Sequence, residues 1–359
     1  MKPLDLSCFC SDYEAACQRF CKDADDAGCT LRNFLLPANR NLGLNVARFG
    51  PKETSRVLFI LSGVHGVEGL CGSGCQVDWL RSGYAAEIPP DMAVVLLHFV
   101  NPWGGARTCV ENENNVDLNR NFLDHTRPYP VNPLYRELHA AFTCPEYEGP
   151  LRDAAEQEIR DFIFQYGFDA FLDAAARGQY DHKKGFNFGG NSEQWSNRVV
   201  RHVFAEESAH AKRVAVVDIH TGLGPYGEGM VIFDGSPGSE AEKRARSWYG
   251  SDIACNDSGE IGYKTTGGLV EGCASEFPRS EYTGIVLEYG TREIERVAGA
   301  MRYSFWLQHF GDFDSELGLK IRNELLDAFY VDADDWKEMV LKRARDVLAQ
   351  AITGLAGST

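Results

Sequence analysis

The sequence predicts an α/β fold: a single domain in which a mixed, mostly parallel β-sheet is flanked by helices. Two observations support this prediction. Short, almost entirely apolar runs such as residues 57–61 and 93–100 are typical of strands buried on both faces, and segments of helical length separate them. Several runs lead into a glycine turn or a polar side chain, and the carboxyl ends of such strands are where open α/β sheets bind ligands.

Composition and charge limit the classes of partner. The chain has 359 residues, 44% of them hydrophobic and 25% charged, which suits a soluble globular protein with a large core. Its 36 basic and 52 acidic residues give a net charge of −16, so we expect neither nucleic acid nor a membrane as a partner. No apolar run reaches the length of a membrane span, and residues 1–10 lack the apolar core of a signal peptide. We expect one cytoplasmic domain over residues 1–359, of undetermined oligomeric state.

The 11 cysteines form an odd count, and five lie in the first 29 residues: Cys8, Cys10, Cys17, Cys21 and Cys29. These five lack C-x-x-C spacing. We interpret them as reduced thiols that act as small hydrophobic side chains. A thiol metal site or a redox pair is the alternative.

Periodicity and capping residues predict the order of the elements. Helices are expected at 13–27, 67–81, 133–142, 151–166, 192–207, 240–253, 293–310, 315–330 and 335–352, and the last three form a helical tail over 293–353. Strands are expected at 44–49, 57–61, 93–100, 168–174, 214–220, 230–233 and 283–287. For residues 153–177 one continuous helix is the alternative. His98, inside an apolar run, is expected to be a satisfied core side chain rather than a ligand.

The first candidate site follows the predicted strand 57–61. Residues 62–69 read Ser-Gly-Val-His-Gly-Val-Glu-Gly and place His65 three residues before Glu68. If a helix starts in this turn, both side chains can point at one spot, and an imidazole with a carboxylate suits zinc. The pair is weak evidence by itself, because histidine and glutamate with this spacing also occur on solvated helix faces.

Two further stretches strengthen the site. The polar segment 106–133 contains Asp117, Asn119 and Arg120, which lie between Trp103 and Phe122 in the sequence. The two flanking aromatic residues favour an ordered binding or catalytic site over a disordered surface loop. The strand 214–220 ends in His220, which gives a second strand-borne histidine. The last predicted strand delivers Glu288 at its end.

This order of residues resembles the zinc carboxypeptidases of the M14 family. The order is His65-x-x-Glu68, Arg107, Asp117-x-Asn119-Arg120, His220 and Glu288. It resembles most closely the branch grouped as DUF2817, and more distantly the succinylglutamate desuccinylases and aspartoacylases. The resemblance covers roughly residues 55–295, and its specific parts are Asp-x-Asn-Arg-Asn-aromatic and Asp-Ile-His-Thr-Gly.

The resemblance implies a catalytic zinc site. His65, Glu68 and His220 would be the three ligands of one zinc ion, which leaves a position for water, as in catalytic rather than structural sites. Glu288 would act as the general base. Arg107 would stabilise the oxyanion, although its spacing to the next motif is shorter than in the digestive carboxypeptidases.

The resemblance also implies how a substrate is held. Asn119 and Arg120 would bind its free carboxylate. Asp117 would orient a ligand histidine. The carboxypeptidases also use a mobile tyrosine before the general base, and the sequence leaves three candidates open: Tyr249, Tyr263 and Tyr282.

Three functions are compatible with these residues. The first is a metallocarboxypeptidase that releases a C-terminal amino acid from a small peptide. The second is a deacylase of N-acyl amino acids, disfavoured because that branch usually adds a β-rich C-terminal domain, whereas the tail here is helical by pattern. The third is a metal-containing binding protein without activity, which would need neither Glu288 nor Arg107.

Overall fold

The computed structural model describes residues 3–83, 88–256 and 264–357, which form one eight-stranded sheet in the order β1-β2-β4-β3-β5-β8-β6-β7. The fold class is the one predicted. The strands are β1 Thr30–Leu36, β2 Asn39–Phe49, β3 Arg56–Ser62, β4 Met92–His98, β5 Arg213–Tyr226, β6 Gly229–Phe233, β7 Ala254–Cys255 and β8 Glu281–Gly290.

The four central strands β4, β3, β5 and β8 are parallel, and antiparallel neighbours extend the sheet at both ends. Their sequences are continuous apolar runs because both faces are covered by helices. Side chains alternate between two cores: Leu58 and Ile60 of β3 belong to one, and Phe59 and Leu61 to the other. The apolar runs therefore identify the centre of the sheet.

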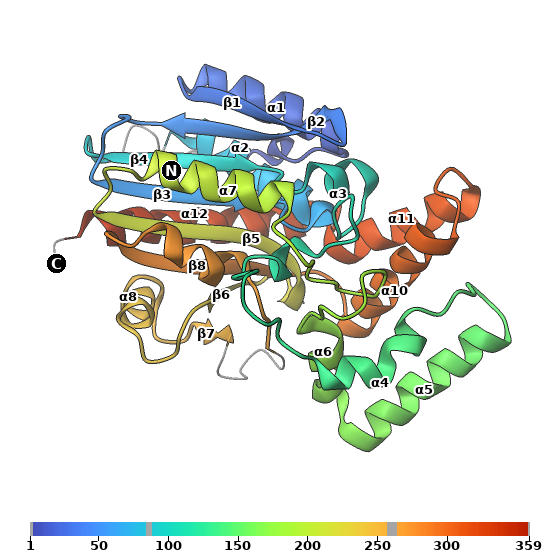
Figure 1. The fold of residues 1–359 in the computed structure, drawn as a ribbon. Coiled ribbons are helices and arrows are strands. Elements are labelled where there is room, and N and C mark those ends of the chain that lie inside the picture. Colours follow the sequence, from blue (N-terminus) through green and yellow to red (C-terminus); the bar gives the residue numbers. More distant parts are fainter. Residues whose placement is uncertain (1–2, 84–87, 257–263, 358–359) are drawn as a thin grey trace.

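Helices cover both faces of the sheet (Figure 1). The core that contains Leu58 is closed by α1, α2, α8 and α12, and the core that contains Phe59 is closed mainly by α7. The helices are α1 Tyr13–Asp26, α2 Gly69–Ser82, α3 Pro102–Arg107, α4 Pro133–Phe142, α5 Pro150–Tyr166, α6 Phe168–Ala176, α7 Trp195–Glu207, α8 Glu240–Tyr249, α9 Leu269–Gly272, α10 Ile294–Phe310, α11 Glu316–Phe329 and α12 Asp334–Ala356. Short 3₁₀ turns are η1 Leu6–Cys8, η2 Gly66–Glu68, η4 Leu118–Arg120 and η6 Cys273–Glu276.

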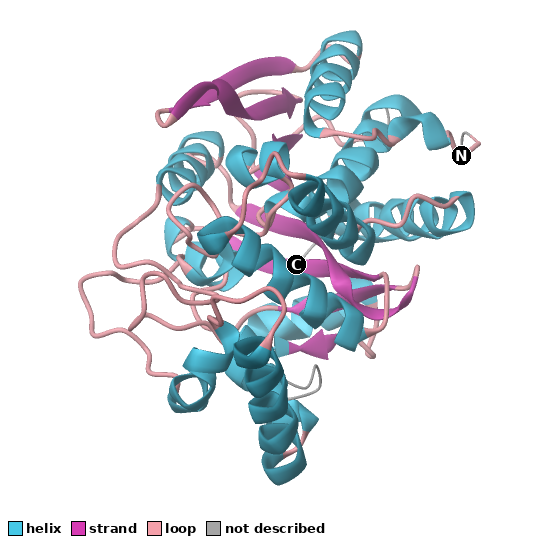
Figure 2. Ribbon diagram, turned by 90° about the vertical axis from the view of Figure 1, so that its right-hand side faces the viewer, coloured by secondary structure: helices cyan, strands magenta, loops and turns pink. Residues whose placement is uncertain are grey.

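The segment with α4, α5 and α6 forms a helical cap beyond the carboxyl ends of the central strands, on the same side as α10 and α11 (Figures 1 and 2). The predicted strand 168–174 is wrong, because this segment is helix α6. A continuous helix over 153–177 is also wrong, because Gly167 has φ 91° and separates α5 from α6. The apolar residues of α6 that suggested a strand instead pack against α4 and α5.

Three other differences from the predicted elements concern local structure. Strand β1 was not predicted, because it is an edge strand with an irregular burial pattern. The Pro-Trp-Gly-Gly stretch after β4 forms the short helix α3, which was not predicted and which the Asn101 side chain caps. Helix α8 stops at Tyr249, because Gly250 adopts φ 110°.

The N-terminal cysteines Cys8, Cys10, Cys17, Cys21 and Cys29 form no disulfide bonds. Burial raises the pKa of each thiol, to about 12 for Cys8 and Cys17 and about 11 for Cys29, which keeps these thiols neutral. This agrees with their interpretation as small hydrophobic residues.

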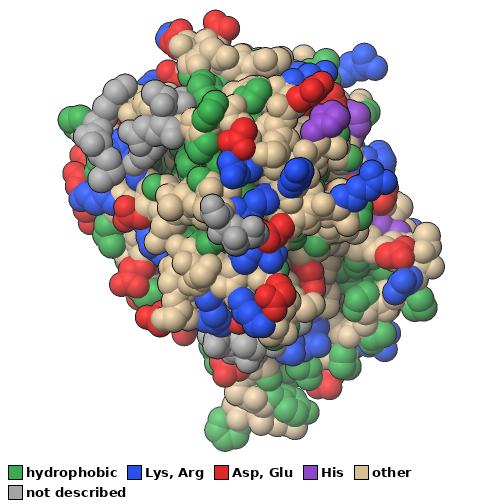
Figure 3. Space-filling model, turned by 90° about the vertical axis from the view of Figure 1, so that its left-hand side faces the viewer, with side chains coloured by type: hydrophobic (Ala, Val, Ile, Leu, Met, Phe, Trp, Pro, Cys, Tyr) green, Lys and Arg blue, Asp and Glu red, His purple; other side chains and the backbone are tan. Residues whose placement is uncertain are grey.

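His98 is fully buried, and its ring stacks on Phe20 and bonds to Ser73, as expected for a core side chain. Across the described residues, every helix is too short or too polar to cross a bilayer. On the face drawn in Figure 3, opposite the cap, Lys and Arg side chains are interspersed with Asp and Glu.

Candidate metal centre and its cavity

The three predicted ligands meet at the carboxyl edge of the sheet. His65 follows β3, Glu68 ends the turn η2, and His220 lies in β5. Gly66 allows this turn to approach α3 closely, because a Cβ atom there would lie 2.1 Å from the backbone of Gly104. One ligand atom from each of the three side chains lies within 4.8 Å of the other two.

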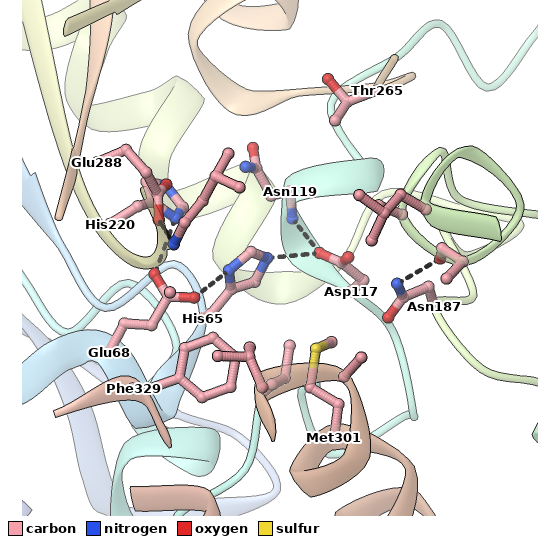
Figure 4. A pocket seen from close by; sticks show the side chains of 18 of the residues that line it. His65, Glu68, Asp117, Asn119, Asn187, His220, Thr265, Glu288, Met301 and Phe329 are labelled. Carbon is pink, nitrogen blue, oxygen red and sulfur yellow. Dashed lines mark hydrogen bonds and ion pairs between the residues drawn. The ribbon is translucent and has the colours of Figure 1, made fainter. Parts of the chain in front are cut away.

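The donor atoms face one another (Figure 4). His65 Nδ1 lies 2.7 Å from Glu68 Oε1, and His220 Nδ1 lies 3.0 Å from Glu68 Oε2. The backbone N–H of Thr221 donates to Glu68 Oε2 at 3.1 Å, which fixes the carboxylate between the two rings. Two imidazole nitrogens and one carboxylate oxygen are a donor set that zinc prefers.

The second nitrogen of each ring is held by a carboxylate. His65 Nε2 lies 3.0 Å from Asp117 Oδ1, and His220 Nε2 lies 2.9 Å from Asp218 Oδ2. Ligand histidines usually bond through their other nitrogen in this way, which fixes the ring orientation. The residues therefore fit a zinc ion. Asp117 is in contact with His65, which is the contact that its predicted orienting role requires. The role of Asp218 was missed, although residues 218 and 220 of one strand share a face.

The carboxylates set the charge state of the rings. Burial disfavours the charged form of His65, but Glu68 and Asp117 outweigh it and raise the pKa of His65 to about 10. Asp218 and Glu68 likewise raise the pKa of His220 against the effect of burial. Burial opposes ionisation of Glu68, yet the two imidazoles lower its pKa. The centre is thus a strongly coupled set of charges.

Glu288 lies beside this centre. In the parallel pairing of β5 with β8 it is the direct partner of His220, so both side chains emerge at the same edge. Its Oε1 accepts a hydrogen bond from the backbone N–H of Leu223 at 3.1 Å, and the residue is 9% exposed. Burial, followed by the charge of Glu68, raises the pKa of Glu288. A carboxyl group with a raised pKa in a cavity suits proton transfer.

Asn119 and Arg120 also line the cavity. Arg120 is buried, and its Nε and Nη1 donate to the carbonyls of Ala176 and Asn119, both at 2.8 Å. Its Nε lies 3.8 Å from Asp117 Oδ2. Asn119 Oδ1 accepts from the backbone N–H of Leu269. The guanidinium is therefore held rigidly at the rim of the metal centre.

Arg107 is not brought to this site. Its guanidinium lies 4.1 Å from the ring centroid of Phe313 and 5.2 Å from that of Trp103. Arg107 is not among the described residues that line the cavity, although nearby Val110 is. The short helix α3 directs Arg107 away from the cavity, a turn that spacing in the sequence does not reveal.

The structure does not select one of the three tyrosines that were candidates for the mobile catalytic tyrosine. Tyr249 is buried in the core, and the Tyr282 hydroxyl donates to the Val270 carbonyl; the described part of the cavity lining includes neither. Tyr263 lies outside the described residues.

The cavity also contains polar residues that were not predicted. Asp234 Oδ1 accepts from Asn256 Nδ2 at 2.7 Å, and burial raises the pKa of Asp234. Asn187 is 3% exposed and has φ 49°, and its Oδ1 has no hydrogen-bond partner in the described structure. Neither residue belongs to a motif, so the sequence gives no signal for them.

Comparison with solved structures identifies the fold. The fold is that of the carboxypeptidases: bovine thrombin-activatable fibrinolysis inhibitor, solved with a tick carboxypeptidase inhibitor, superposes with a TM-score of 0.52 at 11% identity, covering 96% of this chain and 97% of that chain. Carboxypeptidase A from Helicoverpa armigera gives a TM-score of 0.47 at 14% identity, covering 94% and 74%. The chain therefore has the fold of the carboxypeptidases, with His65, Glu68 and His220 grouped at one edge of the sheet.

The chain belongs to the family described as "Protein of unknown function (DUF2817)", which matches residues 9–343. This confirms the resemblance stated above. Among proteins with curated descriptions, none matches the chain.

Replacing Asp218 with asparagine should weaken zinc binding by about 10–100-fold, the usual cost of losing a carboxylate that orients a ligand histidine. The reason is the 2.9 Å contact with His220 Nε2. Competition with a zinc chelator measures the affinity. Asp252→Asn, an exposed position, is the matched control. Equal affinities for both variants would show that Asp218 does not support the centre.

Proposed function

We propose that this protein is a zinc-dependent hydrolase of amide bonds, most simply a metallocarboxypeptidase that releases an amino acid with a free carboxylate. The observation that carries the proposal is the shared cavity. It brings the His65-Glu68-His220 centre, the carboxyl group of Glu288 and the guanidinium of Arg120 together. The carboxypeptidase fold supports a peptide-like substrate.

A zinc ion at this centre would supply a Lewis acid that polarises a carbonyl and acidifies water. Glu288 would accept a proton from the attacking water and pass it to the departing amine. Its hydrogen bond from Leu223 N–H holds one oxygen in place. Asp117 and Asp218 would keep the two imidazoles oriented throughout.

Arg120 would bind the substrate's carboxylate. Because Nε and Nη1 already hold backbone carbonyls, the remaining Nη2 is the nitrogen placed to receive a substrate oxygen. An oxyanion role for Arg107 gains no support from its position between Trp103 and Phe313.

The helices after β8 favour the peptidase over the desuccinylase-like deacylase. Residues 294–356 form α10, α11 and α12 rather than a β-rich domain that would narrow the cleft. The inactive binding protein is disfavoured, because a metal binder has no need for a buried glutamate beside the metal ligands.

A substrate screen tests the proposal. C-terminally free dipeptides, their amides and N-acyl amino acids are incubated with the zinc-loaded protein, and amino acid release is measured. Release from dipeptides is the expected result. Release from N-acyl amino acids alone would identify the deacylase, and release from none, with zinc bound, would contradict hydrolase function.

Replacing Arg120 with alanine should lower kcat/KM for a substrate with a free carboxylate by roughly 10–100-fold, since a hydrogen bond to a charged group contributes about 1.5–3 kcal/mol. Its amide, which lacks the charge, should lose far less. The ratio of acid to amide corrects for any general damage to the fold. Arg127→Ala, with a side chain 81% exposed, is the control. Equal losses for acid and amide would refute carboxylate binding by Arg120.

A further inference from the structure

The cavity of about 160 Å³ extends from the metal centre to the underside of the helical cap. We call this extension the cap chamber. It is formed by the end of α4, one face of α6, the loop before α7, and α10. Its walls consist of Phe142, Phe171, Leu172, Phe186, Ala298 and Met301.

The walls of the cap chamber are preformed. Phe142, Phe171 and Phe186 belong to the core of the cap, which is separate from the cores on the sheet. The ring centroid of Phe142 lies 6.0 Å from that of Phe171 and 5.5 Å from that of Phe186. Aromatic rings held by such contacts keep a cavity open for a ligand instead of collapsing into it.

The charged group in the wall of the cap chamber is already paired with a carboxylate. Arg302 lies in its wall, but the guanidinium is paired with Glu156, although its Nε has no partner in the described structure. Asn187 donates through Nδ2 to the Ala175 carbonyl at 2.7 Å, which leaves the buried acceptor Oδ1 unpartnered. An unpartnered acceptor of this kind repels a carboxylate.

Asn119 and the Met301 wall of the cap chamber lie on different sides of the contact between His65 and Asp117. In Figure 4 Asn119 and Thr265 are on one side of the His65–Asp117 contact, and Met301 and Phe329 are on the other. A substrate could place its amide bond at the metal centre and the carboxylate of its amine portion toward Asn119. The acyl portion, on the other side of the amide bond, would then point toward Met301.

We propose that the cap chamber binds a large apolar group, either an acyl chain or the side chain of the residue that supplies the acyl group, carried on the carbonyl carbon of the bond that is cleaved. This inference rests on the proposed amide hydrolysis. Water adds to that carbonyl carbon, the C–N bond breaks, the apolar acid leaves from the cap chamber, and the amine takes up a proton. An acidic acyl group such as succinyl would place a charge among the apolar walls of the cap chamber and beside the Asn187 acceptor, so we expect it to bind there more weakly.

The test is a series of N-acyl derivatives of one amino acid: acetyl, octanoyl, phenylacetyl and succinyl. Because each buried methylene is worth roughly a fourfold change, kcat/KM for octanoyl and phenylacetyl should exceed that for acetyl at least about 30-fold. Succinyl should not exceed acetyl. Met301→Trp, which fills the cap chamber, should reduce the octanoyl-to-acetyl ratio at least about tenfold, and Met301→Ala should shift the preference to longer chains. Met339→Trp, at a 37% exposed position on α12, is the matched control.

Calorimetry separates this inference from the proposed function. Octanoate, phenylacetate, acetate and succinate are titrated into the purified protein and into Met301→Trp. Tighter binding of the two apolar acids, weakened by Met301→Trp, supports the cap chamber even if no amide is cleaved. Amide hydrolysis with equal rates for all four acyl groups, or with succinyl preferred, would overturn the inference and leave the hydrolase standing. A ratio unchanged in Met301→Trp would overturn it as well.

Discussion

Replacing Glu288 with glutamine should lower kcat by about 10²–10⁴-fold while zinc remains bound at one ion per chain. Loss of a general base has a cost of this size. Glutamine keeps the shape of the side chain and its hydrogen bond from Leu223 N–H, so the change removes proton transfer and little else. Turnover by the zinc-loaded variant and its metal content are measured together.

Glu111→Gln is the matched control for this variant. Glu111 is also buried, burial also raises its pKa, and it is bonded to Gln308. It is, however, absent from the described lining of the cavity. Parent turnover in Glu288→Gln would remove the residue from the reaction, and loss of zinc in that variant would make it a ligand instead.

Replacing His65 with alanine should abolish stoichiometric zinc binding together with activity. The variant removes one of three donors, and the loss should exceed the about 10–100-fold expected when only an orienting carboxylate is lost. It also leaves Glu68 and Asp117 facing each other without the imidazole that bonds to both. Metal analysis after dialysis against a weak chelator measures the effect.

His202→Ala provides the same substitution away from the centre, at a side chain 61% exposed on α7. It should keep zinc and activity. Stoichiometric zinc in His65→Ala would show that the centre is built from other residues. A loss of zinc in both variants would point to a change in folding instead of a lost ligand.

The sequence predicted the centre of the sheet, because β3, β4, β5 and β8 contain continuous apolar runs rich in the β-branched residues valine and isoleucine. The predicted ligands follow from these strands, because His65 comes just after β3 and His220 lies within β5, next to β8. His65 and His220 could therefore be placed without coordinates.

The cap was harder to predict. Phe168–Ala176 is apolar and short, so periodicity alone does not distinguish a strand from a helix packed on other helices. The position of Arg107 between Trp103 and Phe313 was also hard to predict, because α3 is only six residues long and is set by the close approach of Gly66 to Gly104. Asn187 depends on a positive φ that no motif announces.

The direct pairing of His220 with Glu288 has a further consequence. Because adjacent residues of a strand point to opposite faces, deleting a single amino acid within β8 ahead of position 288 would send the glutamate to the far face of the sheet. The helices and most of the hydrophobic packing could survive such a deletion. The separation between the predicted metal centre and Glu288 is therefore fixed by the hydrogen-bonded pairing of β5 with β8. Shifts of the surrounding helices would leave this separation unchanged.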